Sequence, residues 1–234
     1  MERFLIAPDS FKGSMSSIEI CDIIRSVILE HIPNAFVEVL PIADGGEGTV
    51  DCFMACIDGE RIGVNVTGPD FKNVFAEYCV VEDGNTAVIE LAAAAGLTLA
   101  RKPNPATTTT YGVGELIRDA AKRGVKRIIL GLGGSATNDA GTGLAAALGV
   151  KFFNKAGNEF IPVGGTLSEI SGFDTLPAKK LLCDIEIIAL CDVVNPLYGK
   201  SGAAHVFARQ KGADDKTVEM LDTQLGSFTD LVLR

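Results

Sequence analysis

The spacing of hydrophobic residues at the start of the chain alternates between strand and helix patterns. A short apolar run at residues 3–7 ends at Pro8, which is typical of a buried strand that stops abruptly. Ser16 and Glu19 have the spacing of a capping box, and isoleucines and valines then recur at helical spacing up to position 28. A second strand is predicted at 36–42 and a second helix at 49–57. This βαβα order predicts a parallel sheet and an α/β fold.

The middle of the chain changes character. Three short strand patterns at 61–66, 74–81 and 86–91 are separated by turn residues, which predicts a small antiparallel meander. A short helix is expected at 92–99 and a connection at 101–110. A helix with one apolar stripe then runs from Tyr111 to a stop at Gly124, and a β-branched strand follows at 126–130.

The last hundred residues contain a second alternation of patterns. They predict a helix at 138–148, a strand at 151–154, a loop-rich stretch at 157–176, a buried strand at 185–192 and a helix at 214–233.

Composition and charge exclude several classes of protein. The chain has 234 residues, of which 47% are hydrophobic and 22% charged, an ordinary globular balance. Its formal net charge of −9 argues against a general nucleic-acid or anionic-membrane binder. We expect no transmembrane segment and no signal peptide, and therefore a cytoplasmic protein. The six cysteines form no C-x-x-C pair and there are only two histidines, so we expect reduced thiols and no structural metal site.

Four polar loops follow predicted strands, where ligands of open α/β sheets collect. The third, at 131–139, joins a strand to a predicted helix through a glycine-rich turn that can direct N–H groups at an anion, with Gly133, Gly134, Ser135, Asn138 and Asp139. It also matches the dinucleotide pattern G-x-G-x-x-A, but the next predicted strand lacks the acidic residue that would hold a ribose. We therefore favour a phosphate or polar-substrate loop over a dinucleotide site, and a merely structural turn is the third interpretation. Asn138 and Asp139 also suit a helix start.

The other three loops carry charged and polar side chains. In the first, Lys12 suits contact with a phosphate and Asp9 suits a hydroxyl or a hydrated Mg²⁺, although each also suits a solvated loop or a helix cap. Carboxylates follow the other strands, and each has a structural alternative as a helix-terminal charge or a turn cap. The candidate site residues of these loops are Asp9, Ser10, Lys12, Ser14, Asp44, Gly45, Gly46, Glu47, Asp192 and Asn195.

Taken together, the loops resemble the bacterial type I glycerate kinases. The resemblance rests on residues 7–14 (APDSFKGS), 43–49 (ADGGEGT), 108–117 (TTTYGVGELI), 131–139 (GLGGSATND), 191–197 (CDVVNPL) and 210–213 (QKGA). These motifs are long, ordered and spread over nearly the whole chain.

The resemblance implies two α/β domains with a cleft between them, one of them flavodoxin-like, and ATP-dependent phosphorylation of D-glycerate at its 2-hydroxyl with Mg²⁺ as the companion of ATP. We place candidate domain breaks near residues 60 and 105. Within this frame Lys12 and Asp192 are the expected catalytic residues, and Asp44 and Asp192 are the expected Mg²⁺ ligands. The remaining candidate residues are expected to bind substrate or phosphate.

Family members continue well beyond the position that corresponds to Arg234, so the resemblance covers only their N-terminal portion. This departure leaves open a kinase that is inactive alone or needs a complementing C-terminal fragment, and a non-catalytic ligand-binding or assembly remnant. A nucleotide-dependent oxidoreductase is the third alternative, which the absent ribose acid disfavours. Apolar surface left uncovered predicts self-association.

Overall fold

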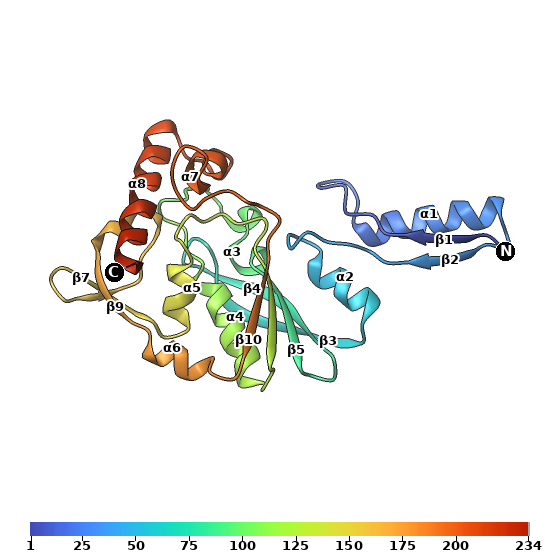
Figure 1. Cartoon of the computed structure of the whole chain (residues 1–234), viewed down its shortest axis with the longest axis horizontal. Coiled ribbons are helices and arrows are strands. Elements are labelled where there is room, and N and C mark those ends of the chain that lie inside the picture. Colours follow the sequence, from blue (N-terminus) through green and yellow to red (C-terminus); the bar gives the residue numbers. More distant parts are fainter. Residues whose placement is uncertain (234) are drawn as a thin grey trace.

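The computed structural model of the protein describes residues 1–233. Its N-terminal unit consists of β1 (Arg3–Ile6), α1 (Ser17–His31) and β2 (Phe36–Val39), and the two strands pair in parallel. The capping box predicted for α1 is present, with Ser16 as N-cap and Glu19 at the third helical position. In Figure 1 this unit extends to one side of the remaining elements. The parallel β1–α1–β2 arrangement is therefore confirmed.

The apolar stripe predicted for α1 is only partly covered. Ile20 is buried, whereas Ile23, Ile24 and Val27 are exposed. Leu5 of β1 is exposed as well. Because parallel strands are normally covered on both faces, this unit presents an uncovered apolar surface.

A five-stranded sheet forms the centre of the molecule. Its order is β10 (Glu186–Leu190), β6 (Arg127–Gly131), β5 (Thr86–Glu90), β4 (Asn73–Val81) and β3 (Gly59–Thr67). The predicted meander is confirmed, because β3, β4 and β5 pair antiparallel. The meander is not a separate small sheet, because β5 also pairs in parallel with β6, and β6 pairs in parallel with β10. The α/β class is confirmed.

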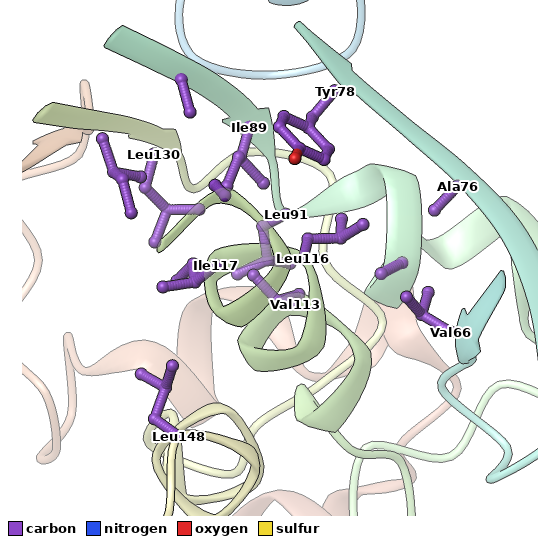
Figure 2. Packing of buried hydrophobic residues seen from close by; sticks show 14 of the residues in the cluster. Val66, Ala76, Tyr78, Ile89, Leu91, Val113, Leu116, Ile117, Leu130 and Leu148 are labelled. Carbon is purple, nitrogen blue, oxygen red and sulfur yellow. The ribbon is translucent and has the colours of Figure 1, made fainter. Parts of the chain in front are cut away.

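Helices cover both faces of this sheet. On one face, α4 (Tyr111–Lys122) buries Val113, Leu116 and Ile117 against strand residues such as Ile89 (Figure 2). On the other face, α2 (Thr49–Cys56) packs Val50 against Val88 and its neighbours. Ile89 and Val88 are consecutive residues of β5, so the strand alternation directs them to opposite helices. The short α3 (Ala92–Ala95) and the 3-10 turn η1 (Leu97–Leu99) follow β5.

The C-terminal elements build a second core. Phe152, Leu167, Val218, Leu221 and Leu225 pack there. The elements that follow β6, apart from β10, are α5 (Thr142–Ala147), β7 (Lys151–Asn154), β8 (Glu159–Phe160), η2 (Gly164–Glu169), β9 (Ile170–Asp174), α6 (Leu176–Leu181), α7 (Ala203–Phe207), η3 (Arg209–Lys211) and α8 (Asp215–Val232). In this group β7, β8 and β9 form a separate antiparallel sheet. No described helix is long and apolar enough to cross a membrane.

Three sequence-based expectations need correction. The stretch 157–176, expected as loop, contains β8, η2 and β9, because a two-residue strand and a strand with Gly172 leave little periodicity to read. The helix expected at 138–148 begins only at Thr142, because buried hydrogen bonds to Asp139 hold the preceding residues in turns. The strand at 185–192, expected to be buried, is an edge strand in which Ile187 and Ile188 are exposed.

Candidate functional site

A cavity of about 890 Å³ lies where the loops that follow β1, β2, β6 and β10 meet. β1 and β2 form one parallel pair, and β6 and β10 form another in the five-stranded sheet, and the loops at the carboxyl ends of both pairs line the cavity. Residues of α7 and η3 complete the wall. The predicted site residues that line the cavity are Asp9, Ser10, Lys12, Ser14, Asp44, Gly46, Glu47, Gly133, Gly134, Ser135 and Asp192.

Lys12 stands at the centre of a group of carboxylates. Its ammonium donates a hydrogen bond to Asp44, and its side chain is 73% exposed. The hydrogen bond to Asp44 raises the pKa of Lys12, and the charges of Asp44, Asp9 and Asp192 add to that increase. Lys12 in turn lowers the pKa of Asp44. The lysine is therefore fully protonated at neutral pH, and two of its acidic neighbours, Asp9 and Asp192, come from loops after different strands.

Two glycine-rich loops touch backbone to backbone beneath this group. The Gly133 amide donates to the Gly45 carbonyl oxygen over 3.1 Å. A Cβ on Gly131 would lie 2.3 Å from that same oxygen, and a Cβ on Gly45 would lie 2.7 Å from the carbonyl oxygen of Leu190. Gly45 also has φ of +88°, which favours glycine. Gly45 does not line the cavity, but its lack of a side chain lets the loops that line the cavity approach each other closely.

The glycine-rich loop after β6 offers donors to the cavity. Its flanks are fixed, because Ala136 N–H donates to Ala95 and the Gly134 carbonyl accepts from Leu97 N–H. Within the described part of the chain, the amides of Gly134 and Ser135 have no hydrogen-bond acceptor. Backbone N–H groups without a partner are suited to binding an anion.

Besides Gly45, three predicted site residues lie away from the cavity lining. Asp139 is buried and accepts hydrogen bonds from the backbone and hydroxyl of Thr110 and from the amides of Gly141 and Gly143. Burial raises the pKa of Asp139, and those hydrogen bonds oppose the increase. Asn138 is also buried, and its Oδ1 has no hydrogen-bond partner among the described residues. The Asn195 amide donates to the Ser201 carbonyl and holds its own loop.

Lys211 is the functional candidate that sequence reasoning missed. It lines the cavity, is only 7% exposed, and donates to Ser135 Oγ and to the Thr137 carbonyl, both over 2.7 Å. Burial lowers the pKa of Lys211 to about 8, and the charge of Asp139 opposes this shift. The motif at 210–213 was the only signal in the sequence, because the residue lies 76 positions from Ser135 and follows no parallel strand.

The dinucleotide interpretation of the glycine-rich loop finds no support in the topology. A dinucleotide fold places the next strand beside the first in the same parallel sheet. Here the next strand, β7, belongs to the separate antiparallel sheet, and β6 lies between β5 and β10. The strand that follows the loop along the chain therefore cannot place a ribose-binding acid beside it, as it does in a dinucleotide fold.

The carboxylates of the cavity are spread out. Among residues 1–233, no three histidine, cysteine, aspartate or glutamate side chains gather closely enough to hold a metal ion by themselves. Mg²⁺ often takes only one or two protein carboxylates and completes its shell with water and phosphate oxygens. Asp44 and Asp192 line the same cavity and fit that limited role.

The fold and the cavity define an α/β protein with a cavity lined by charged side chains at the carboxyl ends of its parallel strands. The model of the glycerate kinase family matches residues 4–234, and the chain belongs to that family.

Relatives of known name agree with this assignment. The chain is 46% identical to a glycerate kinase of Bacillus cereus over 232 residues, which are 98% of this chain and 61% of the relative. It is 42% identical to the glycerate 2-kinase of Escherichia coli K12, with the same coverage of 98% and 61%. The crystal structure of a protein assigned as glycerate kinase 2 in Salmonella typhimurium LT2 superposes with a TM-score of 0.90 at 42% identity, and covers all of this chain and 63% of that one. The chain thus spans about three-fifths of the length of these relatives.

Proposed function

We propose that the chain forms the substrate-binding part of a kinase that transfers a phosphoryl group from ATP to the 2-hydroxyl of D-glycerate. The observation that carries the proposal is the convergence of four strand-end loops on one cavity that contains two lysines, several carboxylates and a glycine-rich loop with free amides. Phosphoryl transfer depends on positioning and on stabilising charge, and these groups are suited to both.

The individual roles follow from position and charge. Lys12 is the mobile cation, because its exposed side chain can leave Asp44 for a phosphoryl oxygen or for the glycerate carboxylate. Asp192 would accept the proton of the attacking hydroxyl, since it lines the cavity and follows β10, the strand that pairs with β6 ahead of the glycine-rich loop. Asp9, Ser10, Ser14 and Glu47 supply further polar groups for the substrate.

Mg²⁺ is proposed to arrive with ATP and to neutralise charge on its phosphates. Asp44 or Asp192 would supply a protein oxygen to its shell, in agreement with the absence of a three-residue metal cluster among the described residues. Because MgATP is abundant in the cytoplasm, we expect the protein to act there.

A coupled assay of ADP release with D-glycerate and MgATP tests the proposal. The assay is run on the chain alone and with an added polypeptide equivalent to the remaining two-fifths of the relatives. ADP release that requires D-glycerate in either arm supports the kinase. Release in neither arm, with both polypeptides folded, contradicts it.

A second candidate is a ligand-binding or assembly protein without catalysis. It is favoured by the exposed apolar surface of the β1–α1–β2 unit. Calorimetric binding of D-glycerate or ATP without ADP release, even with the added polypeptide, would identify this alternative.

A further inference from the structure

Lys211 is a buried cation whose direct partners are neutral. Its ammonium donates to the Ser135 hydroxyl and to the Thr137 carbonyl. Within residues 1–233 it makes no ion pair within 4 Å. Asp139 attracts it electrostatically, but the oxygens of Asp139 are engaged by Thr110, Gly141 and Gly143.

A buried charge without a contacting counter-ion is costly, so such charges are normally paired. Lys211 also lines the cavity, which gives an anion access to it. Among the described residues, the Lys211 ammonium therefore has no contacting negative group, and a ligand that enters the cavity can supply one.

The backbone next to Lys211 is also suited to binding an anion. The Gly134 and Ser135 amides have no acceptor in the described chain, and the Ser135 hydroxyl that accepts from Lys211 can donate its own proton to a ligand. Lys12, at the mouth of the same cavity, is already paired with Asp44. The two lysines are thus in different electrostatic states before any ligand binds.

We propose that Lys211, with the amides of Gly134 and Ser135, forms a subsite for a tetrahedral phosphoryl oxyanion, in which the lysine supplies the fixed positive charge. The inference rests on the proposed function, since a phosphoryl group is the tetrahedral anion that a kinase must hold. It assigns that anion to the interior lysine and leaves Lys12 for the mobile role.

The titration of Lys211 makes this subsite measurable. Its pKa of about 8 means that it loses its charge between pH 7 and pH 9, whereas the pKa of Lys12 is raised and that lysine stays charged. Charged groups also lie on the elements around Lys211. Asp139 precedes α5, Arg209 of η3 pairs with Asp215, and His205 of α7 lies near Asp222. The acidic residues that line the cavity are Asp9, Asp44, Glu47, Asp51 and Asp192. Two thiols, Cys52 and Cys191, also line the cavity, and burial raises the pKa of Cys52.

Sulfate is the probe, because it is tetrahedral and keeps its charge from pH 7 to pH 9. Its affinity is measured by equilibrium dialysis at several pH values. If only the ammonium form of Lys211 binds it, the affinity falls about tenfold between pH 7 and pH 9, in proportion to the protonated fraction. The series is repeated in Cys191→Ser, which should show the same fall.

Two lysine variants locate the effect. Lys211→Met keeps the length of the apolar stem and should bind sulfate weakly and independently of pH. Lys12→Met removes the other cavity lysine and should retain the tenfold fall, whatever its absolute affinity. Circular dichroism checks that each variant is folded. If Lys211→Met does not fold, the profiles of the unmodified chain and of Lys12→Met still decide the question.

Several results would overturn the proposal. They are a pH-independent affinity in the unmodified chain, no sulfate binding at all, a fall that disappears in Cys191→Ser, or a fall that persists in folded Lys211→Met. A parallel series with D-glycerate tests a carboxylate as the ligand: a tenfold fall for D-glycerate with none for sulfate would also refute the phosphoryl assignment. The assay needs no turnover, so a chain that shows the sulfate profile but releases no ADP in either arm of the coupled assay supports the subsite and contradicts only the kinase.

Discussion

The amide of Gly133 donates a hydrogen bond to the carbonyl oxygen of Gly45 over 3.1 Å, which joins the loops after β2 and β6 at the floor of the cavity. Neither loop leaves room for a side chain at this contact. The geometry of the candidate site therefore depends on glycines whose role is to permit close backbone approach.

Gly131→Ala tests this contact. The new Cβ would lie 2.3 Å from the Gly45 carbonyl oxygen, so one loop must move. We expect a loss of about 1–3 kcal/mol in the free energy of unfolding by urea, together with weaker ligand binding. Gly172→Ala is the matched control, because a Cβ there meets nothing within 4 Å. Equal stability of the two variants would refute the close-contact argument.

Lys12→Ala tests the mobile cation. Because Lys12 is exposed and bound to Asp44, its removal should leave the fold intact. In the form of the protein that releases ADP, we expect turnover to fall about a hundredfold or more, since a cation at a transferring phosphate stabilises developing charge. Lys155→Ala, at an exposed turn away from the cavity, should keep full turnover. Near-normal turnover of Lys12→Ala would remove the residue from the proposed mechanism.

Asp192→Asn tests the proposed base. The change keeps the size of the side chain and removes its charge, so kcat should fall about 10²–10⁴-fold while the melting temperature hardly changes. Asp184→Asn, at the opposite end of β10, is the control and should behave like the unmodified chain. If both variants have similar kcat values, Asp192 does not act as the base.

Lys211 should make stability depend on pH. Its pKa is lowered from 10.5 to about 8 in the folded protein, so between these values the unfolded chain holds a proton that the folded chain has lost. Stability must then rise with pH across this window, and the penalty for burying the charge is complete only below pH 8. From pH 7.5 to pH 9.5, unfolding by urea at low salt should show a gain of about 2 kcal/mol relative to Lys211→Met. A constant difference between the two proteins would contradict the shift.

The exposed side of α1 predicts self-association. Ile23 and Val27 are 52% and 50% exposed on one side of this helix, next to a parallel sheet that is covered on one face only. Sedimentation should show an average mass that grows with concentration, and the double variant Ile23→Glu, Val27→Lys should reduce it without destabilising the helix. Leu176→Gln, which changes a leucine of α6 that is 63% exposed, is the control. A monomer at every concentration would argue against an interaction surface here.

Local patterns predicted most of the elements but not their surroundings. The capping box at Ser16 and the stripe of α4 depend on residues three or four positions apart, so they are visible in the sequence. The exposure of Ile23 and Ile188 is not, because it depends on whether another segment covers them. β9 was missed because its irregular pairing with β7 depends on residues about twenty positions away.

The sequence by itself determined the α/β class, the order of most strands and helices, and the loops that carry Lys12, Asp44 and Asp192, because each of these has a short-range signal. Only the tertiary structure decided that Asp139 is enclosed by Thr110 and two glycine amides while Lys211 reaches the cavity. The reason is physical: burial, and therefore the pKa of a charged side chain, is set by atoms that come from distant parts of the chain. In the sequence, a charged residue that will be enclosed looks the same as one that will line a cavity. Packing alone separates the enclosed group from the one that can meet a ligand.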